Sequence, residues 1–424
     1  MKVEESLSGQ IVRVELEARA CEWEIAPGLV VDGYGFNGQV PGPTIEGNVG
    51  DTLVVHLKNA LPEPTTIHWH GLRVPADMDG TEMVQRPIAP GGEFEYRFTL
   101  PDAGTFWYHP HLNETVQLEK GLYGPLIVRG PDEPTLDRER VLLFDDVKLN
   151  RRGDFARFGG WIQRHNGRQG NVRLVNGKTD ASWEMGARQI ERWRVLNCAS
   201  STYVRLSIGG RTFTILGTDG GLLEHAQPVT EALIAPADRM DLAVGPFEEG
   251  ATFAVEALPY ARGMVKERGG TFAKVRVTAE EPSVAAIPAR LRTIQPLARP
   301  DATPSRTIEL SGQRSLKRGV DWHINHEAHH HDSPVRVGEL QVWDVVNASK
   351  MDHPFHLHGF FFQVLQENGH PRLPISWEDT INVPAQGQVR IAWIADDRPG
   401  SWMYHCHILE HHAAGMMAHF DVVR

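Results

Sequence analysis

The chain is poor in cysteine, has no long apolar run and carries no excess of positive charge. Its three cysteines, Cys21, Cys198 and Cys406, allow at most one disulfide, which excludes a disulfide framework. No apolar segment approaches the roughly 18 residues that span a bilayer, so we do not expect a membrane protein. The formal net charge of -11 argues against nucleic acid or an anionic membrane as partner, because both attract basic surfaces. Small neutral or cationic molecules remain compatible.

An apolar segment is also missing from the amino terminus, MKVEESLSGQ. Such a start is compatible with a cytoplasmic protein and with a mature form whose export signal has been removed. The composition leaves both localisations open.

Helical periodicity is scarce, whereas short alternating strands are frequent. Apolar residues alternate with polar ones at Phe94, Tyr96, Phe98 and Leu100, and 41 glycines and 28 prolines punctuate the chain. Many short strands between Gly and Pro turns predict an all-β protein built from sandwiches or barrels. A length of 424 residues exceeds what one core usually supports, so two or three domains are expected.

An internal repeat sets the number of domains. A glycine followed by an alternating strand and then an asparagine recurs at Gly50 to Asn59, Gly186 to Asn197 and Gly338 to Asn347. Linker-like composition marks residues 130–134 weakly and residues 281–305 more strongly. We therefore predict three similar domains, at residues 1–132, 133–285 and 286–424.

Histidines are the most informative residues, and ten of the 21 fall into four clusters. His68 and His70 follow Asn59 at the offsets at which His356 and His358 follow Asn347. Later in the same two domains, the segments GTFWYH and GSWMYH each open a second His-x-His pair, His109 with His111 and His405 with His407. The middle domain carries Leu206 and Ile208 at the first pair's offsets, so it is interpreted as a spacer without ligands.

The four pairs predict a metal cluster between the first and third domains. Residues i and i+2 of a strand point to the same side, so each pair can aim two imidazoles at one site. Neutral imidazole suits copper, zinc, iron and nickel. The segment HCHILEHHAAGM narrows this choice, because His353, Cys406, His411 and Met416 supply the two imidazoles, thiolate and thioether of a blue-copper site. On its strand Cys406 must point away from His405 and His407, so it can connect two sites.

These motifs resemble those of the multicopper oxidases, and the overall pattern is similar to that of bacterial three-domain laccase-like members. The segments PGPT from Pro41, HWHG from His68, WYHPH from Trp107, GLYGPLIV from Gly121 and HPFHLHG from His353 carry the resemblance over nearly the whole chain. It implies three cupredoxin-like Greek-key β-sandwich domains and four copper ions. It also implies a periplasmic or secreted monomer that oxidises small donors, such as phenols and aromatic amines, and reduces dioxygen to water.

The resemblance assigns the ligands by motif position. The type 1 copper takes His353, Cys406, His411 and Met416, and the type 2 copper takes His68 and His356. One type 3 copper takes His70, His109 and His407, and the other takes His111, His358 and His405. Because reduction of dioxygen consumes protons, an acid near the cluster is required. Asp79 matches the acidic residue that the family places near the type 2 copper, and Asp77 is a weaker candidate.

Two features depart from this pattern or compete with it. Bacterial relatives often carry Glu directly after the second type 1 histidine, where this chain has His412; we expect that side chain to be solvent-exposed or structural. His326 to His330, HEAHH, matches a zinc-protease pattern that works only on a helix. No helical periodicity surrounds it, and a surface loop is expected.

Other functions compete with the laccase-like one. An oxidase of Cu(I) or other metal ions is the nearest alternative, because Met351 and Asp352 precede His353 where metal-oxidising relatives place soft ligands. The stretch after Arg262 lacks the Met-rich insertion of those relatives. Copper storage, simple electron transfer and nitrite reduction fit less well, because none of them uses eight cluster histidines.

Overall fold

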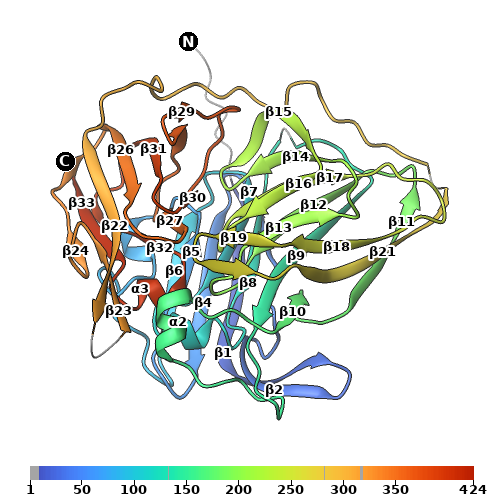
Figure 1. Cartoon of the computed structure of the whole chain (residues 1–424), viewed down its shortest axis with the longest axis horizontal. Helices are drawn as coiled ribbons and strands as arrows, with labels where there is room; N and C mark the ends of the chain where they lie inside the picture. The colour runs from blue at the N-terminus through green and yellow to red at the C-terminus, as the bar shows by residue number, and fades with distance from the viewer. Residues whose placement is uncertain (1–8, 132, 281, 316–318) are drawn as a thin grey trace.

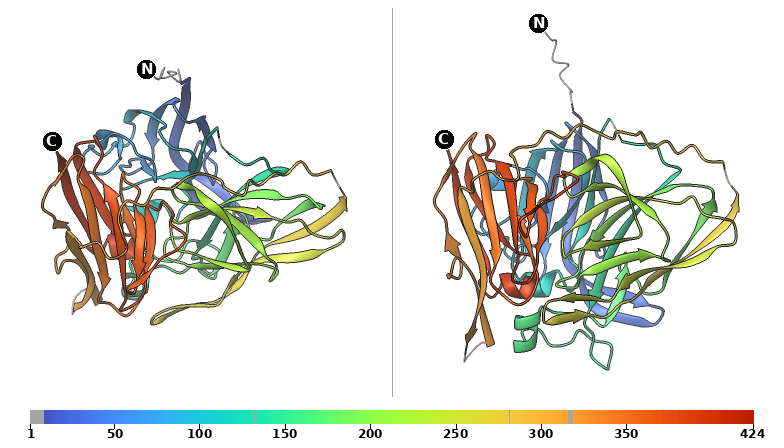
Figure 2. Two further views of the ribbon diagram at one scale, coloured as in Figure 1. Left: turned by 90° about the horizontal axis from the view of Figure 1, so that it is seen from above. Right: turned by 45° about the horizontal axis from the view of Figure 1, so that its top comes forward.

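The computed structural model describes residues 9–131, 133–280, 282–315 and 319–424. It is an all-β protein of three cupredoxin-like β-sandwiches, which confirms the predicted fold class (Figure 1). Seen from above in Figure 2, the sandwiches group around a common centre, so that each one borders the other two. In the part of the chain that is described, no helix is long and apolar enough to cross a membrane.

The first sandwich consists of two four-stranded sheets, ordered β2-β1-β4-β6 and β3-β8-β7-β5. Its strands are β1 (Ile11–Ala26), β2 (Leu29–Phe36), β3 (Ile45–Asn48), β4 (Thr52–Ala60), β5 (His68–His70), β6 (Glu93–Thr99), β7 (Gly104–His109) and β8 (Gly124–Arg129). The alternation predicted around Tyr96 and Phe98 is that of β6, and both rings are buried in the core of this sandwich. Two short helices, η1 (Ala76–Met78) and α1 (Glu114–Gln117), lie in its loops.

The second sandwich packs a six-stranded sheet, β10-β9-β12-β17-β14-β15, against a five-stranded one, β11-β21-β18-β13-β16. Its strands are β9 (Arg138–Val147), β10 (Val172–Val175), β11 (Ala181–Ala187), β12 (Glu191–Asn197), β13 (Val204–Ile208), β14 (Phe213–Thr218), β15 (Gly221–Val229), β16 (Glu231–Ile234), β17 (Arg239–Val244), β18 (Thr252–Leu258) and β21 (Gly270–Glu280). A hairpin of β19 (Tyr260–Arg262) and β20 (Val265–Glu267) and the helix α2 (Trp161–Asn166) project from it. Leu206 and Ile208 are fully buried core residues here.

The third sandwich has a six-stranded sheet, β23-β22-β26-β31-β28-β29, and a second sheet ordered β24-β33-β32-β27-β30, with β25 also paired to β33. Its elements are β22 (Arg306–Ser315), β23 (Gly319–Ile324), β24 (His330–His331), β25 (Val335–Arg336), β26 (Leu340–Asn347), β27 (His353–Leu357), β28 (Gln363–Glu367), β29 (His370–Pro371), β30 (Thr380–Val383), β31 (Gln388–Ile394), β32 (Gly400–Cys406), α3 (Leu409–His412) and β33 (Met417–Val423). In the HEAHH segment, residues 326–329 form a turn and His330 opens β24, so there is no helix and the zinc-protease geometry is not met. The boundaries predicted for the three domains stay predictions.

The repeated asparagine has the same structural role in all three sandwiches. Asn59, Asn197 and Asn347 are buried at the ends of β4, β12 and β26. Each side-chain carbonyl accepts a hydrogen bond from the backbone N–H two residues later, at 2.9, 3.1 and 2.9 Å. Each side-chain amide donates to backbone carbonyls of two other segments, at 2.8 to 3.0 Å. The asparagine therefore fixes the corner at which the chain leaves one sheet, and the repeat detected in the sequence marks that corner.

A small apolar cluster joins the three sandwiches at their centre. It combines side chains from the first sandwich, the second sandwich and α3: Trp107, Leu118, Tyr123, Leu143, Leu196, Cys198, Ala237 and Leu409. All eight side chains are at most 2% exposed. Cys198 is a free thiol, as are Cys21 and Cys406. Burial of this kind contributes roughly 25 cal/mol per Å² of apolar surface, so the cluster stabilises the contact of all three domains.

Candidate metal centres

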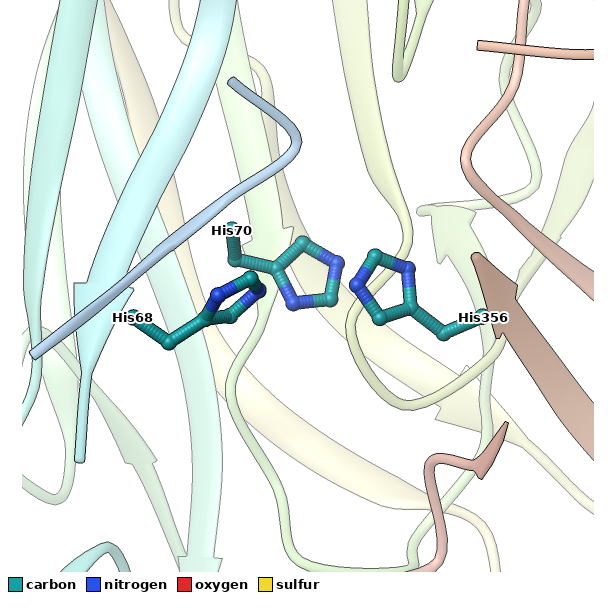
Figure 3. Close-up of side chains that lie close together, drawn as sticks. All are labelled: His68, His70 and His356. Carbon is teal, nitrogen blue, oxygen red and sulfur yellow. The ribbon is translucent and has the colours of Figure 1, made fainter. Parts of the chain in front are cut away.

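Four short strands bring the histidine pairs together. β5 pairs with β7 so that His68 lies opposite His109, and β27 pairs with β32 so that His356 lies opposite His405. The loop after β7 carries His111, and the turn after β32 carries His407. The first sandwich thus presents its imidazoles toward those of the third, as Figure 3 shows for His68, His70 and His356.

The predicted ligands gather in compact groups. Three of these groups hold one nitrogen from each of three histidines, with all such atoms within 4.8 Å of one another: His68, His70 and His356; His70, His109 and His407; and His111, His358 and His405. The last two groups contain the same residues as the two type 3 sets expected from the sequence. All eight histidines are buried. The ligand assignment itself remains a prediction, which the geometry accommodates.

Most ring orientations are set by a hydrogen bond at the outer nitrogen. The Nδ1 atoms of His68, His356, His109 and His405 lie 2.8 to 3.0 Å from backbone carbonyl oxygens. A carbonyl can only accept, so each Nδ1 carries the proton and each Nε2 keeps a lone pair. His70 is reversed, because its Nε2 faces Asp379 Oδ1 at 3.2 Å and its Nδ1 faces the cluster.

The inward-facing nitrogens lack the partners that buried polar atoms normally have. The Nε2 atoms of His68, His111 and His356 and both ring nitrogens of His407 have no hydrogen-bond partner among the described residues. His358 Nε2 and His405 Nε2 lie 3.0 Å apart, although the Nδ1 of each is held by an acceptor. Two lone pairs at that distance repel unless a cation lies between them. Metal ions that accept imidazole nitrogen, copper among them, would satisfy the atoms that face the cluster, including one of the two nitrogens of His407.

Burial keeps these imidazoles neutral and therefore able to bind metal. Burial, followed by the charges of neighbouring histidines, lowers the pKa well below the ordinary value for His70, His358 and His405. The pKa of His353 is lowered to about 3, first by burial and then by Arg262. Protons therefore do not compete with a metal for these nitrogens near neutral pH.

A second, sulfur-containing group lies on the other side of β32. Cys406 Sγ is 3.4 Å from His353 Nδ1 and 3.7 Å from His411 Nδ1, and the two nitrogens are 3.2 Å apart. Met416 is fully buried in the same core, and its carbonyl accepts a hydrogen bond from the Cys406 N–H at 3.1 Å. Burial raises the pKa of the Cys406 thiol to about 12, so a thiolate here needs a metal cation for its stability.

The outer nitrogens of this second group are also held. His353 Nε2 lies 2.7 Å from Ser349 Oγ, and His411 Nε2 lies 3.1 Å from the carbonyl of His165 in α2. The ring of Trp322 packs 4.1 Å from the ring of His411. His165 belongs to the second sandwich, so a domain without predicted ligands orients one of them.

Asp79 is placed where an acid could serve the cluster. Its carbonyl accepts from His68 Nδ1 and its Oδ2 accepts from His358 Nδ1, both at 2.9 Å, and its side chain is fully buried. The next residue, Gly80, has a φ of +84° and packs so closely that a Cβ would lie 1.8 Å from the Ile67 carbonyl. Only glycine permits this approach, which brings Asp79 against β5. Asp77, the weaker candidate, is exposed in η1.

His412 is buried, so the expectation of a solvent-exposed side chain is wrong, and a structural role remains. Its Nδ1 lies 3.1 Å from Glu114 Oε2, and Glu114 Oε1 lies 3.0 Å from His111 Nδ1. The His412 ring stacks on that of His405 at 4.4 Å. Sequence reasoning missed Glu114, which α1 carries into the position between two imidazoles. Its spacing of three residues after His111 was the available signal.

Asp379 was also missed, and no local motif marks it. Besides contacting His70, it gives its backbone carbonyl to His356 Nδ1 and receives Arg239 Nη1 at 2.7 Å. Burial raises the pKa of Asp379, but the guanidinium of Arg239 outweighs this effect and lowers it overall. Arg239 Nε also donates to the Thr105 carbonyl at 3.0 Å. One guanidinium of the second sandwich thus contacts both domains that carry the histidines.

Comparison with known proteins agrees with this geometry. Family models described as multicopper oxidase match residues 18–133, 155–278 and 300–424. The multicopper oxidase MmcO of Mycobacterium tuberculosis is 30% identical over 98% of this chain and 88% of its own length. A multicopper oxidase from Campylobacter jejuni, described as a metallo-oxidase, superposes with a TM-score of 0.87 at 32% identity, covering 99% of this chain and 93% of its own. A laccase from Pediococcus acidilactici gives 0.86 at 28% identity, covering 99% and 91%. The chain therefore belongs to the multicopper oxidase family of oxidoreductases, which bind copper and use dioxygen.

Proposed function

We propose that this protein is a laccase-like oxidase, which takes single electrons from phenols or aromatic amines and reduces dioxygen to two waters. The observation that carries the proposal is the position of Cys406 between two buried groups. Its sulfur lies among His353 and His411, while the histidines directly before and after it in the chain belong to the groups of nitrogens in the interdomain cluster. The two groups are therefore joined covalently by a few bonds of one strand.

Four copper ions would account for the donor set. His353, Cys406, His411 and Met416 would hold the type 1 ion, His68 and His356 the type 2 ion, and the two remaining histidine triads the type 3 pair. Bound in this way, copper would supply one-electron acceptance at Cys406 and dioxygen reduction at the cluster. Asp79 is hydrogen-bonded to His68, a proposed type 2 ligand, and to His358, a proposed type 3 ligand. It is the residue that we propose to hold and deliver protons.

The experiment that tests this function is oxygen uptake by the copper-loaded protein with a phenolic donor, with peroxide assayed alongside. Four donor molecules oxidised per dioxygen, without peroxide, are expected. Cys406→Ser should abolish both the blue absorption and the uptake of oxygen. A blue protein that consumes no oxygen would instead be an electron carrier, and a blue, active Cys406→Ser variant would refute the assignment.

Oxidation of Cu(I) or another metal ion is the second candidate, because the Campylobacter relative is described as a metallo-oxidase. The soft ligand expected for it, Met351, is 2% exposed, and its sulfur lies 3.8 Å from Arg262 Nη1. A fixed guanidinium at that distance repels a cation. Met264 is a better placed thioether, since it is 64% exposed and its backbone N–H bonds the Lys350 carbonyl beside Met351.

The two candidates separate in one assay. Stimulation of turnover by added Cu(II), lost in Met264→Leu but not in Met351→Leu, would establish metal-ion oxidation. Unchanged phenol oxidation in both variants, without any Cu(II) effect, supports the laccase-like function. A periplasmic or secreted location and a monomeric state remain predictions, which fractionation of cells and ultracentrifugation would test.

A further inference from the structure

A cavity of about 580 Å³ lies where all three sandwiches meet, apart from the histidine cluster. Its walls include Ala103 and Pro131 of the first sandwich, Leu222 of the second, and Phe361 and Trp377 of the third. This volume is within the usual range of roughly 300–1,000 Å³ for sites that bind small molecules. Cavities at domain junctions are common binding sites, and the partners of the polar groups in the wall indicate what this one can bind.

Every carboxylate in the wall is already engaged by a guanidinium. Asp102 receives two hydrogen bonds from Arg73, both at 2.7 Å, and Asp396 receives two from Arg398, at 2.8 and 2.7 Å. Arg194 donates to both remaining carboxylates: to Glu133 at 2.8 Å and to Asp241 at 3.2 Å. Among the described residues that line the cavity, no carboxylate is therefore left without a cationic partner.

Arg292 is the exception among the guanidinium groups in the wall. Its Nε and Nη2 atoms are shielded from solvent and have no hydrogen-bond partner, and no ion pair involves it among the described residues. Asp102 and Glu378 attract it from a distance, but burial dominates and lowers its pKa. Arg292 as a whole is half-buried, but leaving two shielded guanidinium nitrogens without partners is costly, because their desolvation is not compensated.

The segment that carries Arg292 is fixed at both ends. The Leu291 N–H donates to the Glu224 carbonyl at 2.9 Å, and the Leu297 N–H donates to Gln363 Oε1 at 2.8 Å. Leu297 itself lines the cavity. The stretch that reads as a linker in the sequence therefore closes this cavity and holds a cation in its wall.

We infer that this cavity binds a small aromatic carboxylate, whose anionic group pairs with Arg292 and whose ring packs on Phe360, Phe361 and Trp377. A monoanion fits better than phosphate or another dianion, because four carboxylates stand in the same wall. The apolar walls require a hydrophobic body, which inorganic anions lack. The ligand would contact all three domains at once and would bind the folded arrangement only, so it would also raise the melting temperature.

The probe is benzoate, titrated calorimetrically into the copper-loaded protein. Benzamide, which has the ring but no charge, and inorganic phosphate, which has negative charge but no ring, are the two comparison ligands. Benzoate is expected to bind at least tenfold more tightly than either. Arg292→Met should weaken benzoate binding at least tenfold, whereas Arg299→Met, at an 84% exposed side chain of the same segment, should leave it unchanged. Ile394→Trp, which enlarges an apolar side chain of the cavity wall without altering charge, should also weaken it at least tenfold.

Several results would overturn the inference. Absence of benzoate binding at about 10 mM, equal binding by Arg292→Met, equal binding of benzamide, or unimpaired binding by Ile394→Trp would each do so. The blue absorption should stay constant during the titration. A change of that absorption in step with the heat of binding would place the anion at copper and not in this cavity. A melting temperature of Arg292→Met at or above that of the parent would establish that its loss of binding is not a loss of folding.

Discussion

Replacing Asp379 by Asn should loosen the copper cluster and the contact between domains together. The carboxylate accepts from Arg239 Nη1 at 2.7 Å and faces His70 Nε2 at 3.2 Å, and all three side chains are at most 2% exposed. Breaking a buried ion pair by removing one charge costs roughly 3–5 kcal/mol. Asp219 Oδ1 remains 3.3 Å from Arg239 Nη1 as a second counter-charge, so we expect about 3 kcal/mol, at the lower end of that range.

The effect on copper follows from the ring of His70. Loss of the anionic acceptor at Nε2 weakens the preference for the tautomer that leaves Nδ1 free for metal, and such outer-sphere changes reduce metal affinity by about 10–100-fold. Urea unfolding of the copper-free protein measures the first effect, and copper content after dialysis against a chelator measures the second. Asp301→Asn is the matched control, because its pair with Arg299 is exposed and contributes less than about 1 kcal/mol. If Asp379→Asn equals Asp301→Asn in both assays, the reasoning is refuted.

Three further outcomes are expected. Met416→Leu should raise the type 1 reduction potential with copper content unchanged, as redox titration would show; an unchanged potential would argue against axial coordination. Glu114→Gln should reduce copper retention by about tenfold or more, because the anionic partner of His111 and His412 is lost, while Glu63→Gln, whose partner Asn113 is at the surface, should not. The copper-free protein should lose stability below about pH 6.5: His353 takes up its proton on unfolding but stays neutral in the fold until about pH 3, at a cost of about 1.4 kcal/mol per pH unit. Equal urea midpoints at pH 7.5 and 5.5 would contradict that linkage.

The fold and the histidine groups were predictable because their signals are local in sequence. Alternation of residues on β6, the repeated asparagine at three sheet corners and the His-x-His pairs each depend on residues a few positions apart. The direction of Cys406 followed from strand geometry alone, since neighbours on a strand face opposite sides. These features depend on neighbouring residues and not on which tertiary contacts the chain makes.

The residues that orient the ligands were not predictable in this way. Glu114 and His412 are 298 positions apart, and His70 and Asp379 are 309 positions apart. Asp379 stands in no motif, and although Glu114 follows His111 by three residues, the sequence does not show that it also meets His412. Of the two alternatives for His412, solvent-exposed or structural, the first was wrong for this reason: its burial depends on α1 of another domain and not on its neighbours in the chain.

The second sandwich shows most clearly what spacing could not tell. Because it carries Leu206 and Ile208 at the histidine offsets, it was interpreted as a spacer, and both side chains are indeed core residues. Yet its Arg239 holds the acid behind His70, and its His165 carbonyl holds the outer nitrogen of His411. An imidazole binds metal in one direction only when its other nitrogen is fixed. A domain without a predicted ligand therefore helps to determine the geometry of both centres. Substitutions confined to that domain should alter copper binding.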